Sequence, residues 1–306
     1  RGHCQHRGAG DSDLARMTRL FAILARSSRK AVILRRGPSK QVALIAWDRS
    51  DDSFEIGQWF KGRIYERRCD LSPSGRLFVY FAAKHKGPIQ TWTGISRPPY
   101  LTALALWPNL GTWAGGGLFE SENSLLLNQV GGIEDLAKGL EVPDSLKLRL
   151  LPRGDSIDEM DSIYHDRLLR DGWTLAEWGA RTEQKTSRGL NWSYYPARAY
   201  ERKLVRKKVT QVLRMEVRGL NEPQKGWYTL NFEVFGKEGS SLLRLPGVSW
   251  ADWDGNGDLL FAEGGKLFRL PWSNHHAHGR NAARELADFS ALTFTAKEAP
   301  KRARSW

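Results

Sequence analysis

Cysteine and methionine are scarce in this sequence, and long hydrophobic runs are absent. Two cysteines, Cys4 and Cys69, and three methionines occur among 306 residues. One of these cysteines lies near the start of the chain, so the pair predicts no disulfide framework, and a reducing, cytoplasmic environment fits the composition. The longest apolar stretches, such as residues 101–107, are much shorter than the roughly 20 residues of a membrane-spanning helix. We therefore expect a soluble protein with no membrane partner.

The motifs of the common catalytic sites are also missing. The sequence contains no Gly-x-Ser-x-Gly elbow, no His-Glu-x-x-His pair, no phosphate-binding loop and no dinucleotide-binding fingerprint. These absences weigh against the enzyme classes that such motifs identify. Active sites assembled from residues far apart in the sequence escape such a search, so the missing motifs alone do not exclude an enzyme.

Positive charge is abundant but is concentrated near the two ends of the chain. The 47 Lys and Arg residues exceed the 34 Asp and Glu residues by 13, and most of this excess comes from residues 1–36 and 297–306. Residues 1–16 lack the continuous hydrophobic segment of a secretory signal. We predict that residues 1–16 are an extension or tail, that residues 297–306 are a basic C-terminal tail, and that nucleic acid is an unfavoured partner.

One basic cluster lies outside these ends and is the candidate binding site for an anion such as phosphate. Basic residues on an exposed strand more often only keep a protein soluble, so the solvated interpretation is favoured. The members of the cluster are Arg202, Lys203, Arg206, Lys207 and Lys208.

Short apolar segments separated by glycine-containing turns dominate the chain from Met17 onward. The first group comprises residues 20–24, 31–34, 42–47 and 54–60, which predicts four strands joined by hairpin-sized connections. With 30 Gly and 13 Trp residues, the composition also favours strands over helices. We predict an all-β protein.

Two later segments share a strand, a polar turn with glycine, and a second apolar strand. In the first segment the turn is Ser72–Gly75 (Ser-Pro-Ser-Gly) and the apolar strand is 77–82; in the second the turn is Asp254–Gly257 (Asp-Gly-Asn-Gly) and the strand is 259–262. This plan resembles the inner hairpin of TolB-like and WD-repeat-like β-propellers, in which a similar turn recurs once in each blade.

The resemblance implies a single β-propeller over residues 17–296, built from four-stranded antiparallel blades. Six blades are favoured, with five or seven open, and residues 284–294 are expected to close the ring beside the N-terminal strands. The alternative is a two-domain protein with a break somewhere in residues 131–165. The six predicted units cover residues 17–62, 63–108, 109–152, 153–205, 206–247 and 248–296.

Residues 252–263 match the ligand order of an EF-hand calcium loop. Oxygen-bearing side chains occupy loop positions one, three and five, Gly257 occupies position six, and a glutamate occupies position twelve. The flanking residues are strand-like, so a hairpin turn is the favoured interpretation and calcium is the one cofactor left open. The candidate ligands are Asp252, Asp254, Asn256, Asp258 and Glu263.

Three further groups of residues are weaker candidates. Histidines at 275, 276 and 278, together with His3, Cys4 and His6, are metal-binding residue types, although short histidine runs are usually only solvated. An acidic group can attract cations or a basic partner, and five tryptophans can line a carbohydrate or peptide groove instead of packing between blades. The acidic group is Asp155, Asp158, Glu159, Asp161 and Asp166, and the tryptophans are Trp92, Trp113, Trp173, Trp192 and Trp250.

Taken together, these features predict a monomeric, non-catalytic binding or scaffold module for a protein partner. The inference from propeller to binding is an analogy, because the same fold also hosts enzymes. The alternative is therefore a propeller hydrolase or lyase, with carboxylates or histidines from several blades meeting in the central channel.

Overall fold

The computed structural model describes residues 18–37, 40–152, 162–186, 189–206, 209–222, 226–272 and 279–306. These residues are mostly β-strand in several antiparallel sheets, with a single α-helix, which confirms the all-β expectation. The chain forms two compact units. Unit 1 contains residues 1–167 and 289–306, and unit 2 contains residues 168–288.

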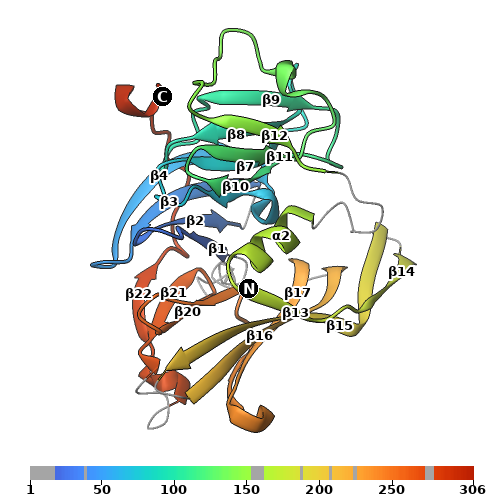
Figure 1. Cartoon of the computed structure of the whole chain (residues 1–306), viewed down its shortest axis with the longest axis vertical. Helices are drawn as coiled ribbons and strands as arrows, with labels where there is room; N and C mark the ends of the chain where they lie inside the picture. The colour runs from blue at the N-terminus through green and yellow to red at the C-terminus, as the bar shows by residue number, and fades with distance from the viewer. Residues whose placement is uncertain are drawn as a thin grey trace, which may run out of the picture. The chain divides into compact units, whose positions relative to one another are not determined.

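The first sheet of unit 1 is a four-stranded antiparallel meander, coloured blue in Figure 1. Its middle strands are rich in β-branched and aliphatic residues, and five consecutive residues from Ala31 to Arg35 are buried, as expected for a strand covered on both faces. The strands, in spatial order, are β1 (Arg19–Leu24), β2 (Lys30–Arg36), β3 (Gln41–Asp48) and β4 (Ser53–Lys61).

The second sheet covers the next stretch of chain and has β7 at its centre. Every residue of β7 is buried, which its run of Phe, Val, Tyr and Ala favours. The short strands β5 and β6 both pair with β7, and β8 and β9 follow on its other side. The elements are β5 (Arg63–Ile64), the 3-10 helix η1 (Glu66–Arg68), β6 (Asp70–Leu71), β7 (Phe78–Ala83), β8 (Thr91–Ser96) and β9 (Ala105–Asn109).

The third sheet of unit 1 has three strands, and its outer pair is parallel. The antiparallel pair β10 (Gly117–Ser121) and β11 (Ser124–Leu127) is joined on its far side by β12 (Lys147–Leu150). The 3-10 helix η2 (Ile133–Asp135) lies on the long connection between β11 and β12. A core of aliphatic and aromatic side chains, including Val79, Trp107 and Phe119, joins this sheet to the second one.

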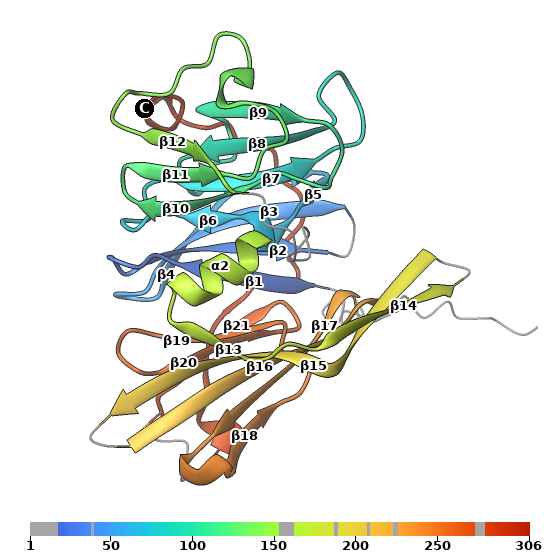
Figure 2. The ribbon, with the colours of Figure 1, turned by 45° about the vertical axis from the view of Figure 1, so that its right-hand side comes forward.

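Equivalent turns at one end of the three sheets contact one another. The turn after β1 donates from the Ser27 N–H to the carbonyl oxygen of Pro73, at 2.8 Å. In the turn between β6 and β7, the Ser74 N–H donates to the carboxylate of Glu122 at 2.9 Å. Glu122 lies in the turn between β10 and β11. Neighbouring sheets of unit 1 are therefore linked through the same part of successive hairpins (Figure 2).

The C-terminal residues of the chain return to unit 1, where they form a segment that we call the C-terminal strap (residues 289–306). The buried Arg35 donates to the carbonyl oxygens of Phe289, at 3.0 Å, and Ser290, at 2.7 Å. Further along, Ala299 and Ala303 are buried against Tyr100. Two alanines of the predicted basic C-terminal tail (residues 297–306) are thus buried in one cluster with Tyr100.

Unit 2 contains one large sheet with very long strands. Strand β15 alone runs for 18 residues and pairs with β13, β14 and β16. The helix α2 (Ser162–Arg170) precedes this sheet and contains the point where the chain passes from unit 1 to unit 2. The strands are β13 (Trp173–Glu177), β14 (Ala180–Thr186), β15 (Gly189–Arg206), β16 (Val209–Glu222), β17 (Gly226–Phe235) and β18 (Ser241–Leu245), with the 3-10 helix η3 (Lys237–Gly239) before β18.

This large sheet differs from the sequence prediction of separate units at 153–205 and 206–247. Strands from both ranges join one sheet, because the long β15 pairs with β16 from Trp192 to Arg206, with one register shift. Eleven residue pairs in that register give the β15–β16 ladder more backbone hydrogen bonding than two separate short hairpins could have.

The last sheet is again a four-stranded antiparallel meander, coloured orange to red in Figure 1. Its last strand pairs with β21, although residues 284–294 were expected to pair beside the N-terminal strands. The elements are β19 (Trp250–Trp253), β20 (Leu259–Glu263), β21 (Lys266–Leu270), the 3-10 helix η5 (Gly279–Ala282) and β22 (Arg284–Asp288); in unit 1, the 3-10 helix η6 (Lys301–Ala303) ends the strap. None of the helices in the described residues has the length and apolar character to cross a lipid bilayer.

Candidate functional site

The calcium-like sequence folds as the β-hairpin turn between β19 and β20. The Asp254 N–H donates to the carbonyl oxygen of Asp258, and the Gly257 N–H donates to that of Asp254, both at 2.8 Å. Gly257 has a φ of +81°, a conformation that glycine adopts without strain. Asn256 supports the turn, because its side chain bonds both the backbone N–H and the carboxylate of Asp258.

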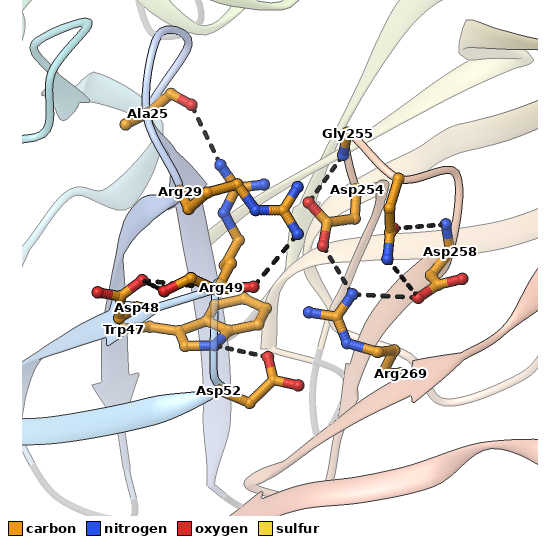
Figure 3. Close-up of polar contacts among 12 residues, drawn as sticks. Ala25, Arg29, Trp47, Asp48, Arg49, Asp52, Asp254, Gly255, Asp258 and Arg269 are labelled. Carbon is orange, nitrogen blue, oxygen red and sulfur yellow. Dashed lines mark hydrogen bonds and ion pairs between the residues drawn. The ribbon is translucent and has the colours of Figure 1, made fainter.

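Arginine side chains neutralise the carboxylates of this hairpin. The Arg269 Nη1 atom lies 2.6 Å from Asp254 and 3.2 Å from Asp258, as Figure 3 shows. Asp254 is fully buried and Arg269 is nearly so, so each charge compensates the desolvation of the other. Glu263, the last residue of β20, pairs with Arg280.

Asp252, the remaining candidate calcium ligand, pairs with Arg202 of the basic cluster on β15. Arg202 donates to the carboxylate of Asp252, and the Trp253 indole N–H donates to the backbone carbonyl oxygen of Arg202, at 3.1 Å. Burial raises the pKa of Asp252, while the charge of Arg202 opposes that rise. The structure therefore brings together one residue from each of the two sites predicted from sequence.

These contacts replace the geometry of an EF-hand. An EF-hand requires a helix that presents its last glutamate to the ion, whereas Glu263 ends a strand. Within the described ranges, no group of three or more His, Cys, Asp or Glu residues is arranged to hold a metal ion. The five candidate ligands form structural ion pairs and a turn instead.

Calcium is accordingly expected to leave the thermal stability unchanged. Three arginines already compensate the carboxylates of residues 252–263, so an incoming ion would have to displace them, including the buried Arg269. The measurement is the melting temperature with millimolar calcium against the same concentration of EDTA. A rise in the melting temperature that saturates with calcium would contradict this assignment.

The two members of the basic cluster whose side chains are described, Arg202 and Lys203, lie on opposite faces of the sheet. Successive residues of a strand point to opposite faces, and Arg202 lies opposite the buried Leu213 whereas Lys203 is exposed. Two residues before Lys203, on the same face of the sheet, a row of paired residues crosses the four strands β15 to β18 and alternates in charge. The row consists of Glu201, Arg214, Glu233 and Arg244. The side chains of Arg206, Lys207 and Lys208 lie outside the described residues.

Most of the weaker candidates also lie outside the described residues. This applies to His3, Cys4, His6 and the histidines at 275, 276 and 278, and to the acidic residues Asp155, Asp158, Glu159 and Asp161. Asp166, the remaining member of the acidic group, lies on α2. Burial raises the pKa of its carboxyl group, and the nearby His165 opposes this rise.

The five candidate tryptophans have different environments. Trp173 and Trp250 are buried, and Trp92 packs edge-on against Phe60 at a ring separation of 5.5 Å. The side chain of Trp192 is not described. Trp113 alone among the described four is mainly exposed, at 68%. Trp173 and Trp250 are therefore buried and Trp92 is partly buried, whereas Trp113 is exposed.

Trp113 lies on a loop that connects β9 to β10, which we call the Trp113 loop (residues 110–116). The buried Arg68 of η1 donates from Nη1 to the carbonyl oxygen of Thr112, at 2.7 Å, and to that of Ala114, at 3.0 Å. Both residues that flank Trp113 are thus held from inside the protein. Arg68 is itself fixed, because its guanidinium stacks over the rings of Tyr65 and Phe81.

Glycine and threonine residues fix both ends of the Trp113 loop. At its start, the Thr91 hydroxyl contacts the carbonyl oxygens of Asn109 and Gly111, each at 2.8 Å. At its end, the Gly116 N–H donates to the Thr93 hydroxyl, at 2.9 Å. Gly116 has a φ of +89°, and a Cβ atom there would collide with the backbone of Arg68. The loop therefore requires glycine at this position.

Two aliphatic side chains are exposed on the Trp113 loop itself and on the segment that is hydrogen-bonded to its end. Leu110 is 90% exposed, and Val130 is 49% exposed. Val130 lies in a neighbouring segment, because the Asn128 N–H donates to the Gly116 carbonyl oxygen at 2.9 Å and the Gln129 amide donates to that of Pro108 at 2.8 Å. We call Leu110, Trp113 and Val130 the Trp113 patch. An exposed apolar group on a fixed loop is a common feature of binding surfaces.

The sequence named Trp113 as a candidate but gave no means of separating it from the other tryptophans. Arg68 was missed entirely. The glycines at 111, 115 and 116 were the available signal, because a glycine-rich segment around one aromatic residue is typical of a tight loop.

No family model and no curated protein matches this sequence. Among solved structures, the chain is similar to the uncharacterised protein lmo1340 from Listeria monocytogenes EGD-e, with 10% sequence identity and a TM-score of 0.26. That match covers 89% of this chain and 83% of the other. A similarity of this size carries no inference about fold or function.

Proposed function

We propose that this protein is a non-catalytic binding module that holds a protein partner on the Trp113 patch. The observation that carries the proposal is the exposed Trp113, whose flanking carbonyl groups are both held by the buried Arg68. Exposed tryptophans contribute strongly to protein interfaces. A side chain on a loop that is already ordered loses little conformational entropy on binding.

We further propose that the sheets are the blades of a β-propeller of the TolB-like or WD-repeat-like type. Two four-stranded antiparallel meanders, β1–β4 and β19–β22, support this architecture, as do the linked hairpin turns of unit 1. The merging of residues 173–245 into one sheet supports five blades over six. A monomeric, cytoplasmic protein fits this proposal.

The proposed binding role predicts site-dependent photocrosslinking. A photoreactive benzoylphenylalanine placed at Trp113 is expected to form a covalent adduct with a partner in an extract of the source organism, measured by gel shift and mass spectrometry. The matched control is the same residue at Tyr195, an exposed aromatic on β15 of unit 2. Adducts of equal yield at both positions, or none at Trp113, would contradict the proposal.

The alternative of a propeller hydrolase or lyase with a site in a central channel stays a hypothesis from sequence. No contact among the described residues favours it over binding.

A further inference from the structure

The loops around the Trp113 patch carry a net positive charge. Strand pairing places Arg63 beside Ala83, and Ala83 beside Thr91, so segments 61–63, 84–90, 110–116 and 128–132 meet at one end of unit 1. These segments contain four Lys or Arg residues and one His, and no Asp or Glu. The basic residues are Lys61, Arg63, Lys84 and Lys86, together with His85.

The hairpin loop 84–90 contributes the most accessible of these charges. Lys84, His85 and Lys86 are all exposed, and no ion pair to them is present in the described part of the chain. The loop folds back on itself, because the Lys84 N–H donates to the Gln90 carbonyl oxygen at 2.8 Å. It is joined to the Trp113 loop through Thr91, which contacts Gly111.

Two carboxylates border this end of unit 1, because Asp135 lies against Gly131 and Glu134 lies against Gly132. Asp135 accepts a hydrogen bond from the Gly132 N–H at 2.9 Å, and Glu66 pairs with Arg36 at 3.5 Å. Glu134 is exposed on η2. The four Lys or Arg residues outnumber these two carboxylates, so the net charge around the Trp113 patch is positive, which favours an anionic partner.

The apolar part of the surface distinguishes between two kinds of anion. Single-stranded nucleic acid binds on successive aromatic side chains, on which its bases stack. In the part of unit 1 that the structure describes, Trp113 is the one exposed large aromatic side chain, and its neighbours Leu110 and Val130 are aliphatic. A surface with one tryptophan and two aliphatic groups fits a bulky apolar side chain of a peptide better than a row of bases.

We infer that the partner presents an acidic segment with one large apolar residue, which docks on the Trp113 patch while its carboxylates face Lys84, His85 and Lys86. This inference rests on the proposed binding function and names the chemistry of the partner. The apolar contact supplies most of the affinity, and the basic rim supplies specificity and salt dependence.

The test uses a fluorescein-labelled peptide with four acidic residues on each side of one phenylalanine, and fluorescence anisotropy as the measurement. Trp113→Ala is expected to weaken binding by about 30-fold. The double variant Lys84→Glu with Lys86→Glu is expected to weaken it by about tenfold and to reduce its dependence on salt. The matched controls in unit 2, Tyr195→Ala and Lys237→Glu, are expected to bind as the unmodified protein does.

Each other outcome has a defined meaning. No binding of the peptide, or equal binding by the Trp113→Ala variant with unchanged thermal unfolding, overturns the inference. If a thymidine oligonucleotide of equal charge binds more tightly than the peptide, the inference of an acidic protein segment is overturned in favour of nucleic acid. If a benzoylphenylalanine at position 113 captures a protein while the peptide does not bind, the partner chemistry is wrong and the proposed function stands.

Discussion

Replacing Arg269 with methionine is expected to lower the free energy of unfolding by about 3–5 kcal/mol. The change keeps much of the side-chain volume but removes the guanidinium nitrogen that lies 2.6 Å from the carboxylate of the fully buried Asp254. A buried carboxylate that has lost its counter-charge costs far more than an exposed one, because protein surroundings solvate the charge poorly. The measurement is the unfolding transition in urea, monitored by tryptophan fluorescence.

The control for this prediction removes the carboxylate charge as well. Asp254→Asn combined with Arg269→Met removes the fully buried charge and leaves only the partly exposed Asp258 without Arg269, so the double variant is expected to be more stable than Arg269→Met alone. The asparagine also keeps a side-chain oxygen that can accept the hydrogen bond from the Gly255 N–H, which Asp254 accepts at 2.7 Å in the unmodified protein. If the double variant is less stable than the single one, the ion pair is not the source of the effect.

Replacing Gly57 with alanine is expected to destabilise unit 1 by about 1–3 kcal/mol or more. Gly57 lies on β4, and a Cβ atom there would come closer than 3.0 Å to the carbonyl oxygen of Pro99. That oxygen already accepts the Gln58 N–H at 2.9 Å. Either the strand or the backbone of the Pro99 loop must move, and the hydrogen bond lengthens in both cases. Thermal unfolding measures the loss.

Gly87→Ala is the matched control for this steric argument. A Cβ atom at Gly87 would meet nothing within 4 Å, and its cost comes only from a φ of +83°. Left-handed backbone costs a non-glycine residue roughly 1 kcal/mol. A loss at Gly57 no larger than the loss at Gly87 would show that β4 and the Pro99 loop can separate easily.

The first two sheets illustrate what local sequence can predict. The segments expected at 20–24, 31–34, 42–47 and 54–60 correspond to β1, β2, β3 and β4, with differences of a few residues at the ends. Apolar runs and glycine-containing turns are local signals, and hairpins pair residues that are close in sequence. Such elements can be recognised without knowing the rest of the fold.

The large sheet of unit 2 and the C-terminal strap show where local signals end. The register that joins β15 to β16 runs from Trp192 to Arg206 with one shift, and the turn-bounded short segments expected from sequence did not indicate a ladder of this length. The strap contains few large apolar residues, and its position depends on Arg35 and Tyr100, which are distant in sequence. No period or turn motif marks such contacts.

For the candidate sites, too, local sequence predicted the turn but not the contacts between residues that are distant in the chain. The oxygen-bearing residues of 252–263 have the spacing of a calcium loop, but the following strand decides that they form a turn. The pairing of Arg202 with Asp252 joins residues fifty positions apart, so spacing could not show it. Trp113 is exposed and Trp173 is buried because of the residues that surround each of them in the fold. The residue type alone does not show which tryptophan is exposed.

The return of the strap to unit 1 has a consequence for synthesis on the ribosome. Residues 168–288 must be translated before Phe289 emerges, which takes roughly 6–24 s at about 5–20 residues per second. During that interval Arg35 lacks the carbonyl oxygens of Phe289 and Ser290, and Trp59 and Tyr100 lack the strap residues that they contact. A nascent chain in this state exposes a surface on which a ribosome-associated chaperone can act until translation is complete.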